Sequence, residues 1–300
     1  RMIKKEVDGI IDVDIDEYFR RVYFPRDSKR GAYSFGDRIG KKYIDESLFM
    51  DGEGVFNDFF VHIADNDVLD DRPGITILEL LDAIYQKMKY VAEGIGTFLL
   101  VAVVVGSGIM AENLANGNNA VALLGNTIAT GAILFVIIKM FGSISGAHFN
   151  PAVSLIFFLK KELDLKDLFY YVFVQILCGI LAVFIIHYIF EIEIFQISSN
   201  IRGEFPLLIS EIIATCGLIL TILFISKNDS NSVAIGVALF ITAGYWFTSS
   251  TSFANPAVTI ARVFTDTFTG ISPSSVIYFI SGQMIGAVAG LKIFQLFDLE

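Results

Sequence analysis

Cysteine and histidine are rare in this sequence, with two and three copies among 300 residues. The cysteines, Cys178 and Cys216, both fall inside long hydrophobic runs, so a disulfide framework is not expected. His62 lies among several aspartates, but no second histidine or cysteine stands beside it to complete a ligand set. We therefore expect a solvated acidic surface around His62, with no metal site, and we expect no cofactor.

Basic residues are also in deficit, because 22 Lys and Arg stand against 32 Asp and Glu and give a formal net charge of −10. This balance argues against nucleic acid as a partner. Residues 1–88 hold 19 acidic and 13 basic residues, no cysteine and no glycine-rich phosphate loop. We expect an acidic cytoplasmic extension of unknown fold there, the alternative being an enzyme or sensor domain. The chain begins with Arg1 rather than Met, as a fragment of a longer protein would.

Hydrophobic residues, in contrast, are abundant, with 54% of the chain, 28 Phe and a mean hydropathy of +0.63. This is more than a soluble domain needs for its core. None of the runs has the short apolar core and small-residue cleavage site of a removable signal peptide. The sequence therefore predicts an all-α membrane protein. Six runs are long enough to cross a bilayer, at residues 90–111, 120–141, 168–190, 206–226, 232–250 and 273–297.

The basic residues near the ends of these runs predict their orientation. With the amino terminus inside, only Arg202 and Arg262 fall on the outer side. Because cytoplasmic loops carry the excess of Lys and Arg, both termini are predicted in the cytoplasm of a multi-pass protein of the cell membrane. The lysines on the cytoplasmic side are Lys87, Lys89, Lys139, Lys160, Lys161, Lys166, Lys227 and Lys292.

Two short motifs, Asn150-Pro151-Ala152 and Asn255-Pro256-Ala257, lie 105 residues apart. Asn followed by Pro is typical of a helix start, since Asn caps free N–H groups and Pro fits the first helical position. Each motif can open about ten helix-compatible residues, roughly 15 Å, or half of a ~30 Å hydrocarbon core. Two such half-helices meeting head to head would cross one membrane.

The chain also reads as a duplication. Glu93 and Glu211 each lie one run ahead of an Asn-Pro-Ala motif, and Gln175 in the third run matches Gln283 in the sixth. Three runs per repeat is an odd number, so the two copies must lie in opposite orientations. We therefore expect a channel-like domain over residues 89–300, with repeats at about 89–165 and 206–270 plus closing helices.

On these residues, and on Ser145-Gly146-Ala147-His148 before the first motif, residues 90–297 resemble the major intrinsic protein family of aquaporins and aquaglyceroporins. The resemblance implies six tilted helices, two re-entrant half-helices, one pore per subunit and a homotetramer. The strings at 106–112 and 250–259 are similar to a bacterial branch associated with arsenic resistance.

The amides of Asn150 and Asn255 and the positive ends of both half-helices are expected at mid-membrane. There they would repel cations and orient a central water against proton relay, although both residues could instead merely cap buried helices. Glu93 and Glu211 could relay protons, whereas the resemblance implies that they accept hydrogen bonds from loop backbone. For His148 the resemblance implies a loop-orienting hydrogen bond, and gating by titration is the alternative.

The residues that would set selectivity depart from the family pattern. The family usually has Arg directly after the second motif, where this chain has Val258. Arg262, one turn beyond, would either restore a positive charge near the mouth or pair with Asp266 or backbone carbonyls. Small uncharged residues predict a wider and less polar opening. Counting from the motifs, the resemblance places the other constriction positions at Thr130, Ala243 and Ser252.

The function that follows is a passive channel across the lipid bilayer for water and small neutral solutes such as glycerol, with arsenite or methylated arsenicals as further candidates. A strict water channel is one alternative. An inverted-repeat secondary transporter is another, but it should show ionisable groups at mid-membrane beyond Glu93 and Glu211. The sequence shows none.

Overall fold

The computed structural model describes residues 4–7, 10–13, 77–203 and 205–297, and the chain divides into two compact units, Arg1–Ile84 and Tyr85–Glu300. In the first unit, strands β1 (Lys4–Val7) and β2 (Ile10–Val13) pair antiparallel. The sequence pattern predicts no element at these residues, so the hairpin is a feature that only the structure shows. His62 and the aspartates around it lie outside the described residues.

Among the described residues, six helices are long and apolar enough to cross a membrane. The six predicted runs are therefore confirmed, with ends that differ by a few residues. The largest differences are at the start of the first helix, which begins at Ile77, and at the end of the second, which continues to Ser145. The helices are α4 (Ile77–Leu114), α5 (Asn119–Ser145), α7 (Leu165–Ile189), α8 (Phe205–Asn228), α9 (Val233–Phe247) and α11 (Val276–Phe297).

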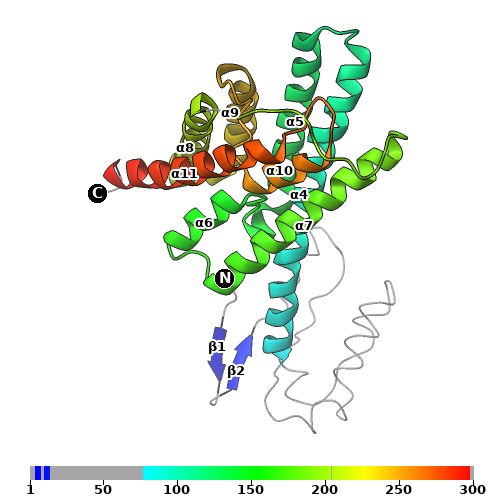
Figure 1. Cartoon of the computed structure of the whole chain (residues 1–300). Helices are drawn as coiled ribbons and strands as arrows, with labels where there is room; N and C mark the ends of the chain where they lie inside the picture. The colour runs from blue at the N-terminus through cyan, green and yellow to red at the C-terminus, as the bar shows by residue number, and fades with distance from the viewer. Residues whose placement is uncertain (1–3, 8–9, 14–76, 204, 298–300) are drawn as a thin grey trace. The chain divides into compact units, whose positions relative to one another are not determined.

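Two short helices, α6 (Pro151–Leu159) and α10 (Pro256–Ala261), begin directly after Asn150 and Asn255. Both have Pro at the first helical position, as predicted, and a 3₁₀ turn, η4 (Arg262–Phe264), extends α10. Figure 1 shows α10 near the middle of the helical unit and α6 below α11, and the two short helices contact each other, α7 and α11. The inverted-repeat expectation of two half-helices inside six long helices is thus the observed arrangement.

Helices α8 and α11 pack along each other through a row of glycines on α11, namely Gly282, Gly286 and Gly290. A Cβ atom added to Gly286 would lie 2.4 Å from the carbonyl oxygen of Ile212 on α8. Small residues at this spacing let two membrane helices approach closely and gain packing contacts. The row therefore fixes the distance between the two helices of the second repeat.

The outer face of α7 is apolar along its whole length. Large hydrophobic side chains recur on it at a spacing of four residues, and all are exposed: Phe169, Phe173, Leu177, Leu181 and Ile185. A soluble protein rarely exposes so continuous an apolar stripe, whereas a bilayer solvates it. The surface of this unit is therefore suited to lipid or to neighbouring apolar helices.

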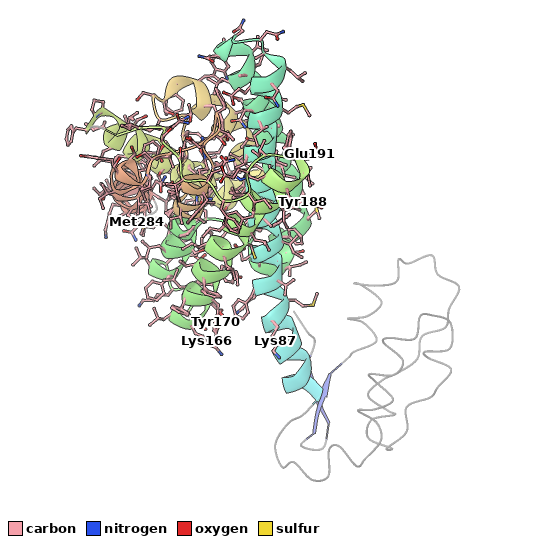
Figure 2. All side chains as sticks on the ribbon, turned by 45° about the vertical axis from the view of Figure 1, so that its right-hand side comes forward. Lys87, Lys166, Tyr170, Tyr188, Glu191 and Met284 are labelled. Carbon is pink, nitrogen blue, oxygen red and sulfur yellow. The ribbon has the colours of Figure 1, made fainter. Side chains whose placement is uncertain are left out.

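Lysines gather at one end of the helical unit. Figure 2 shows Lys87 near the start of the apolar part of α4 and Lys166 near the start of α7 at the same end, while Tyr188 and Glu191 lie toward the other. Helices α4 and α7 therefore begin on the same side, which is the arrangement that the positive-inside argument requires. The side that faces the cytoplasm remains a prediction.

Candidate functional site

Asn150 and Asn255 each bind their own helix and the opposite loop. The Oδ1 atoms accept hydrogen bonds of 2.9 Å from the backbone N–H groups of Ala152 and Ala257, respectively. The Nδ2 atom of Asn150 donates to the carbonyl oxygen of Ala254 at 2.7 Å, and Nδ2 of Asn255 donates to the carbonyl of Phe149 at 2.8 Å. Because a side-chain amide carries two N–H groups, each Asn retains one donor after bridging.

The loops that lead into these residues share an unusual backbone. Ala147 and Phe149 have φ values of 52° and 47°, and the residues at the matching places before Asn255, Ser252 and Ala254, have 50° and 46°. Left-handed conformations of this kind cost roughly 1–3 kcal/mol each in residues other than glycine and persist only where surrounding contacts hold them. The matching φ values show that both loops follow the same strained path.

Two buried glutamates hold these loops in place. Glu93 accepts hydrogen bonds from the backbone N–H of His148 at 2.8 Å and of Phe149 at 2.6 Å. Glu211 accepts from the N–H of Phe253 at 3.0 Å and of Ala254 at 2.8 Å. These bonds satisfy backbone donors that would otherwise be unpaired at bilayer depth.

Each glutamate also has a glutamine partner from a later helix. The Nε2 atom of Gln175 donates to Glu93 at 2.8 Å, and Nε2 of Gln283 donates to Glu211 at 2.7 Å. Ser145 adds a further hydrogen bond to Glu93, with its Oγ 2.7 Å from Oε1. With these bonds both carboxylates are fully occupied behind the loops, which is a loop-holding arrangement rather than that of a proton relay.

His148 is 9% exposed and contacts the first half-helix. Its Nδ1 lies 3.1 Å from Oγ of Ser154, and its ring stacks on Phe157 with centroids 4.5 Å apart. Tyr171 packs edge-on against the same ring. These contacts fix the ring orientation at the wall of the central cavity.

A cavity of about 530 Å³ runs past both Asn residues. One end is bordered by Lys139 and Asn231, and the other by Thr130, Tyr245 and Arg262. Neither Glu93 nor Glu211 is among the described residues that line it. Much of the wall is apolar, with contributions from Leu100, Val104, Leu134, Leu218, Ile222 and Val237.

Comparison with known proteins agrees with this geometry. A sequence model described as "MIP: Major intrinsic protein" matches residues 81–233, which is half of the chain. The chain belongs to the major intrinsic protein family. The resemblance predicted from the two Asn-Pro-Ala motifs and their leading glutamates is confirmed, as is a multi-pass membrane protein with the all-α fold of this family.

Three relatives illustrate the range of similar proteins. Aquaglyceroporin AqpS of Rhizobium meliloti (strain 1021) is 47% identical over 207 residues, covering 69% of this chain and 88% of that protein. Aquaporin NIP2-2 of Zea mays is 30% identical over 220 residues, covering 71% of this chain and 72% of its own length. The X-ray structure of the aquaglyceroporin from Plasmodium falciparum has a TM-score of 0.57 at 21% identity, covers 71% of this chain and 96% of that one, and supports the fold alone.

Within this major intrinsic protein, three of the four expected constriction residues line the cavity: Thr130, Ser252 and Val258. The hydroxyl of Thr130 donates to the carbonyl of Asn126 at 2.8 Å. Since its only hydrogen is used there, the hydroxyl of Tyr245, 3.1 Å away, must donate to Thr130. This pair joins α5 to α9 at the end of the cavity that Arg262 also borders.

The fourth expected residue, Ala243, is placed wrongly by the sequence count. It is exposed on the outside of α9, whereas Ile241 and Tyr245 line the cavity. Residues two positions apart on a helix point about 200° apart, so Ala243 points away from the cavity that Ile241 and Tyr245 line. Counting back from Asn255 therefore selected the wrong face of α9. The reason is that α9 ends at Phe247, and the non-helical residues before Asn255 break the register. The correct face could have been found from the apolar residues that recur every four positions up to Tyr245.

Arg262 is 3% exposed and lines the cavity. Of the two structural alternatives, the bond to a backbone carbonyl is observed, because Nε donates to the carbonyl oxygen of Thr269. Pairing with Asp266 is not observed among the described contacts, and that carboxylate instead accepts from the backbone N–H of Ser199 at 2.8 Å. Arg262 therefore combines a structural bond with a position at the cavity wall.

His187, to which the sequence analysis assigned no role, is fully buried and bridges two outer segments. Its Nδ1 lies 2.9 Å from the carbonyl oxygen of Ile194, and its Nε2 lies 2.8 Å from Oγ1 of Thr265. Both partners come from loops whose paths no sequence pattern specifies. The contact ties the end of α7 to the segment that follows α10.

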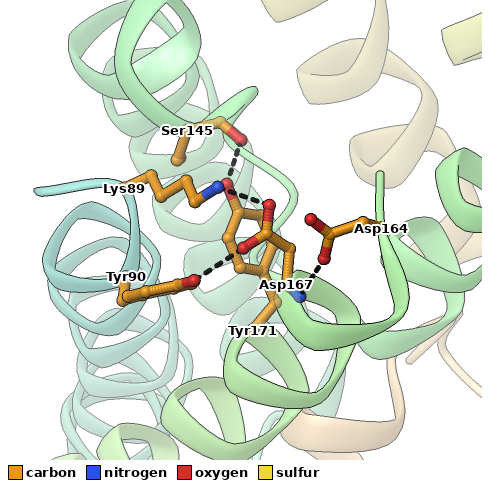
Figure 3. Close-up of polar contacts among 6 residues, drawn as sticks. All are labelled: Lys89, Tyr90, Ser145, Asp164, Asp167 and Tyr171. Atoms are coloured by element: carbon orange, nitrogen blue, oxygen red, sulfur yellow. Dashed lines mark hydrogen bonds and ion pairs between the residues drawn. The ribbon is translucent and has the colours of Figure 1, made fainter. Parts of the chain in front are cut away.

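A polar cluster joins the first turn of α7 to the part of α4 where its apolar stretch begins, near the first motif (Figure 3). Asp167 forms an ion pair with Lys89 and accepts a hydrogen bond from the hydroxyl of Tyr90 at 2.6 Å. The hydroxyl of Tyr171 donates to the carbonyl oxygen of Ser145 at 2.8 Å. Because Ser145 also binds Glu93, the cluster connects α4 and α7 to the loop that carries Asn150.

Proposed function

We propose that this protein is a passive channel for water and small neutral solutes, with glycerol-like molecules included. The single observation that carries the proposal is the junction of Asn150 and Asn255. Each amide is locked by a bond to the opposite loop and retains one N–H group beside the cavity. Two fixed donors at the positive ends of two half-helices suit a solute oxygen and oppose a cation.

The wall of the cavity supports solutes larger than water. Apolar side chains face one part of the passage, and the two loops with their Asn residues face another. The carbon atoms of a polyol can contact the apolar side chains, and its hydroxyl groups can hydrogen-bond to the loops and their Asn residues. With Val258 after the second motif, position 258 itself contributes no long polar side chain to the wall. Neutral arsenite and methylated arsenicals, which are small and hydroxylated, are further candidate solutes.

The rival classes fit less well. A strict water channel would need a constriction at Thr130 and Tyr245, and the contact between their hydroxyl groups is the one observation that favours it. An ion-coupled transporter would need accessible ionisable groups at mid-membrane. Glu93 and Glu211 do not serve this purpose, since loop backbone and glutamine amides occupy their oxygens.

The surroundings of the channel belong to the same proposal. The lysine-rich ends of α4 and α7 support a cytoplasmic location for both termini at the cell membrane. The apolar outer face of α7 is compatible with lipid and with a homotetramer of channels. The acidic residues 1–88 would then lie in the cytoplasm as an extension, without enzymatic activity.

Purified protein in liposomes tests the proposal. Stopped-flow light scattering would follow vesicle volume after gradients of water, glycerol and arsenite. We expect a flux that rises linearly with each gradient. Uptake that saturates and requires an ion gradient would replace the channel by a transporter. Water flux without glycerol or arsenite flux would leave the strict water channel.

A further inference from the structure

Arg262, at the end of the cavity that Thr130 and Tyr245 border, is a buried cation with no ion-pair partner among the described residues. Within the part of the chain that the structure describes, the ion pairs found do not include Arg262. Its guanidinium carbon lies 3.5 Å from the centroid of the Phe253 ring, and its Nε donates to the carbonyl of Thr269. An aromatic face and a carbonyl oxygen orient a guanidinium without neutralising its charge. The positive charge therefore acts on the cavity that Arg262 lines.

Helix geometry explains how this side chain reaches the constriction. Arg262 follows Val258 by four residues, so both lie on one face of α10 and its 3₁₀ extension. Long helical side chains lean toward the preceding turn, which here is the turn of Val258. Since valine is short, it leaves that level free for the guanidinium. The stacking on Phe253, three residues before the helix, shows that Arg262 does lean this way.

A second arginine, Arg202, lies near the Phe253 ring and lines a different cavity. Arg202 donates from Nε to the carbonyl of Gly270 at 3.0 Å and from Nη2 to the carbonyl of Phe268 at 3.1 Å. Its guanidinium carbon lies 5.7 Å from the Phe253 centroid. Arg202 lines a separate polar cavity, whereas Phe253 and Arg262 line the central one. The Phe253 ring therefore lies between the two cavities. Arg262, which lines the central cavity, and Arg202, which lines the polar one, both lie near it.

We propose that Arg262 is the cation barrier and hydrogen-bond donor of this channel's constriction, and that Phe253 is its positioning residue. The proposal rests on the proposed channel function and deepens it. Val258 contributes no charge of its own, and the charge acts from a side chain that begins one helical turn further along, at Arg262. Neutral hydroxylated solutes can accept from the guanidinium N–H groups as they pass. A cation meets an unneutralised charge in a low-dielectric passage and is rejected.

Charge removal at position 262 tests the barrier. Liposomes containing R262Q or R262M would be assayed for Na⁺ and H⁺ entry with fluorescent indicators, beside water flux in the same vesicles. We expect cation entry at least tenfold above wild type. The double variant V258R/R262V, which moves the arginine inward by one turn, should restore exclusion. K292Q serves as the control, because it removes an exposed charge on α11 outside the cavity and should leak no cations.

The results separate failure of the inference from failure of the channel function. Wild-type vesicles that pass neither water nor glycerol would overturn the channel. A conducting wild type whose R262Q and R262M variants exclude cations equally well would overturn only the role of Arg262. The same holds if these variants assemble but pass nothing, since removal of a barrier cannot close a pore. If neither variant assembles, F253L provides the test, because it removes the ring on which Arg262 stacks. An unchanged ratio of glycerol permeability to water permeability in F253L would refute the proposal.

Discussion

Asn150 and Asn255 each perform three tasks with one amide group. The oxygen caps a half-helix, one N–H bridges to the opposite loop, and the second N–H remains beside the cavity. An isosteric carboxylate can perform only the first of these tasks. The residue type at these two positions is therefore more constrained than helix capping alone requires.

Replacing Asn150 or Asn255 by Asp should lower the flux of neutral solutes or admit cations. The carboxylate cannot donate to the carbonyl of Ala254 or Phe149, and an unpaired buried carbonyl costs about 1–3 kcal/mol. Its negative charge would also oppose the positive barrier. Asn118→Asp is a matched control, because Asn118 caps α5 through the same Oδ1 atom at an exposed site. Unchanged flux and cation exclusion in both test variants would remove the two Asn residues from the pore.

Replacing Val258 by Arg should lower glycerol and arsenite permeability by a larger factor than water permeability. The new side chain adds length and donors to a wall shared with Thr130 and Ser252, and Arg262 already lies one turn away. Larger solutes should lose access first. Val258→Leu, which adds volume without charge, separates size from polarity. Equal reduction for all solutes in stopped-flow assays would show that position 258 does not set the size limit.

At the scale of helices, the glycine row of α11 sets the geometry of the second repeat. Gly286→Leu should prevent the close approach of α8 and α11, because its Cβ alone would lie 2.4 Å from a carbonyl oxygen. Overpacking of this kind typically costs about 1–3 kcal/mol. We expect earlier thermal unfolding in detergent and a loss of monodisperse protein in size-exclusion chromatography. Ile285→Leu, at an exposed neighbouring position, should behave as wild type.

The sequence predicts elements better than it predicts registers. The helices and the two half-helix starts follow from run length and from Asn-Pro chemistry, both of which are local. The duplication predicts that Gln175 and Gln283 occupy equivalent places, but it does not predict that they donate to Glu93 and Glu211. The position of Tyr245 at the cavity could not be predicted by counting residues from Asn255, because the segment between α9 and α10 is not helical. The stacking of Arg262 on Phe253 depends on how a loop folds back, and no periodicity encodes that path.

For the molecule as a whole, the helical unit supports its own polar backbone. The loops of both motifs find their partners within Tyr85–Glu300. Deleting residues 1–84 should therefore leave a folded channel with water permeability close to that of the full chain. Circular dichroism and light scattering of the truncated protein would check this. A truncated chain that inserts and assembles but conducts nothing would make the extension part of the pore machinery.

The reciprocal bonds between the two loops also bear on how the protein is made. The carbonyl of Phe149 is synthesised about a hundred residues before Asn255, the donor that satisfies it. Until the second loop is inserted, the carbonyl oxygen of Phe149 lacks this hydrogen bond within the membrane. An unsatisfied backbone group there costs several kcal/mol of free energy. Insertion of the second loop removes this cost and supplies the carbonyl of Ala254 to Asn150 in return. Neither half of the chain is then complete alone, and closure of the junction is expected as a late, cooperative step of biogenesis.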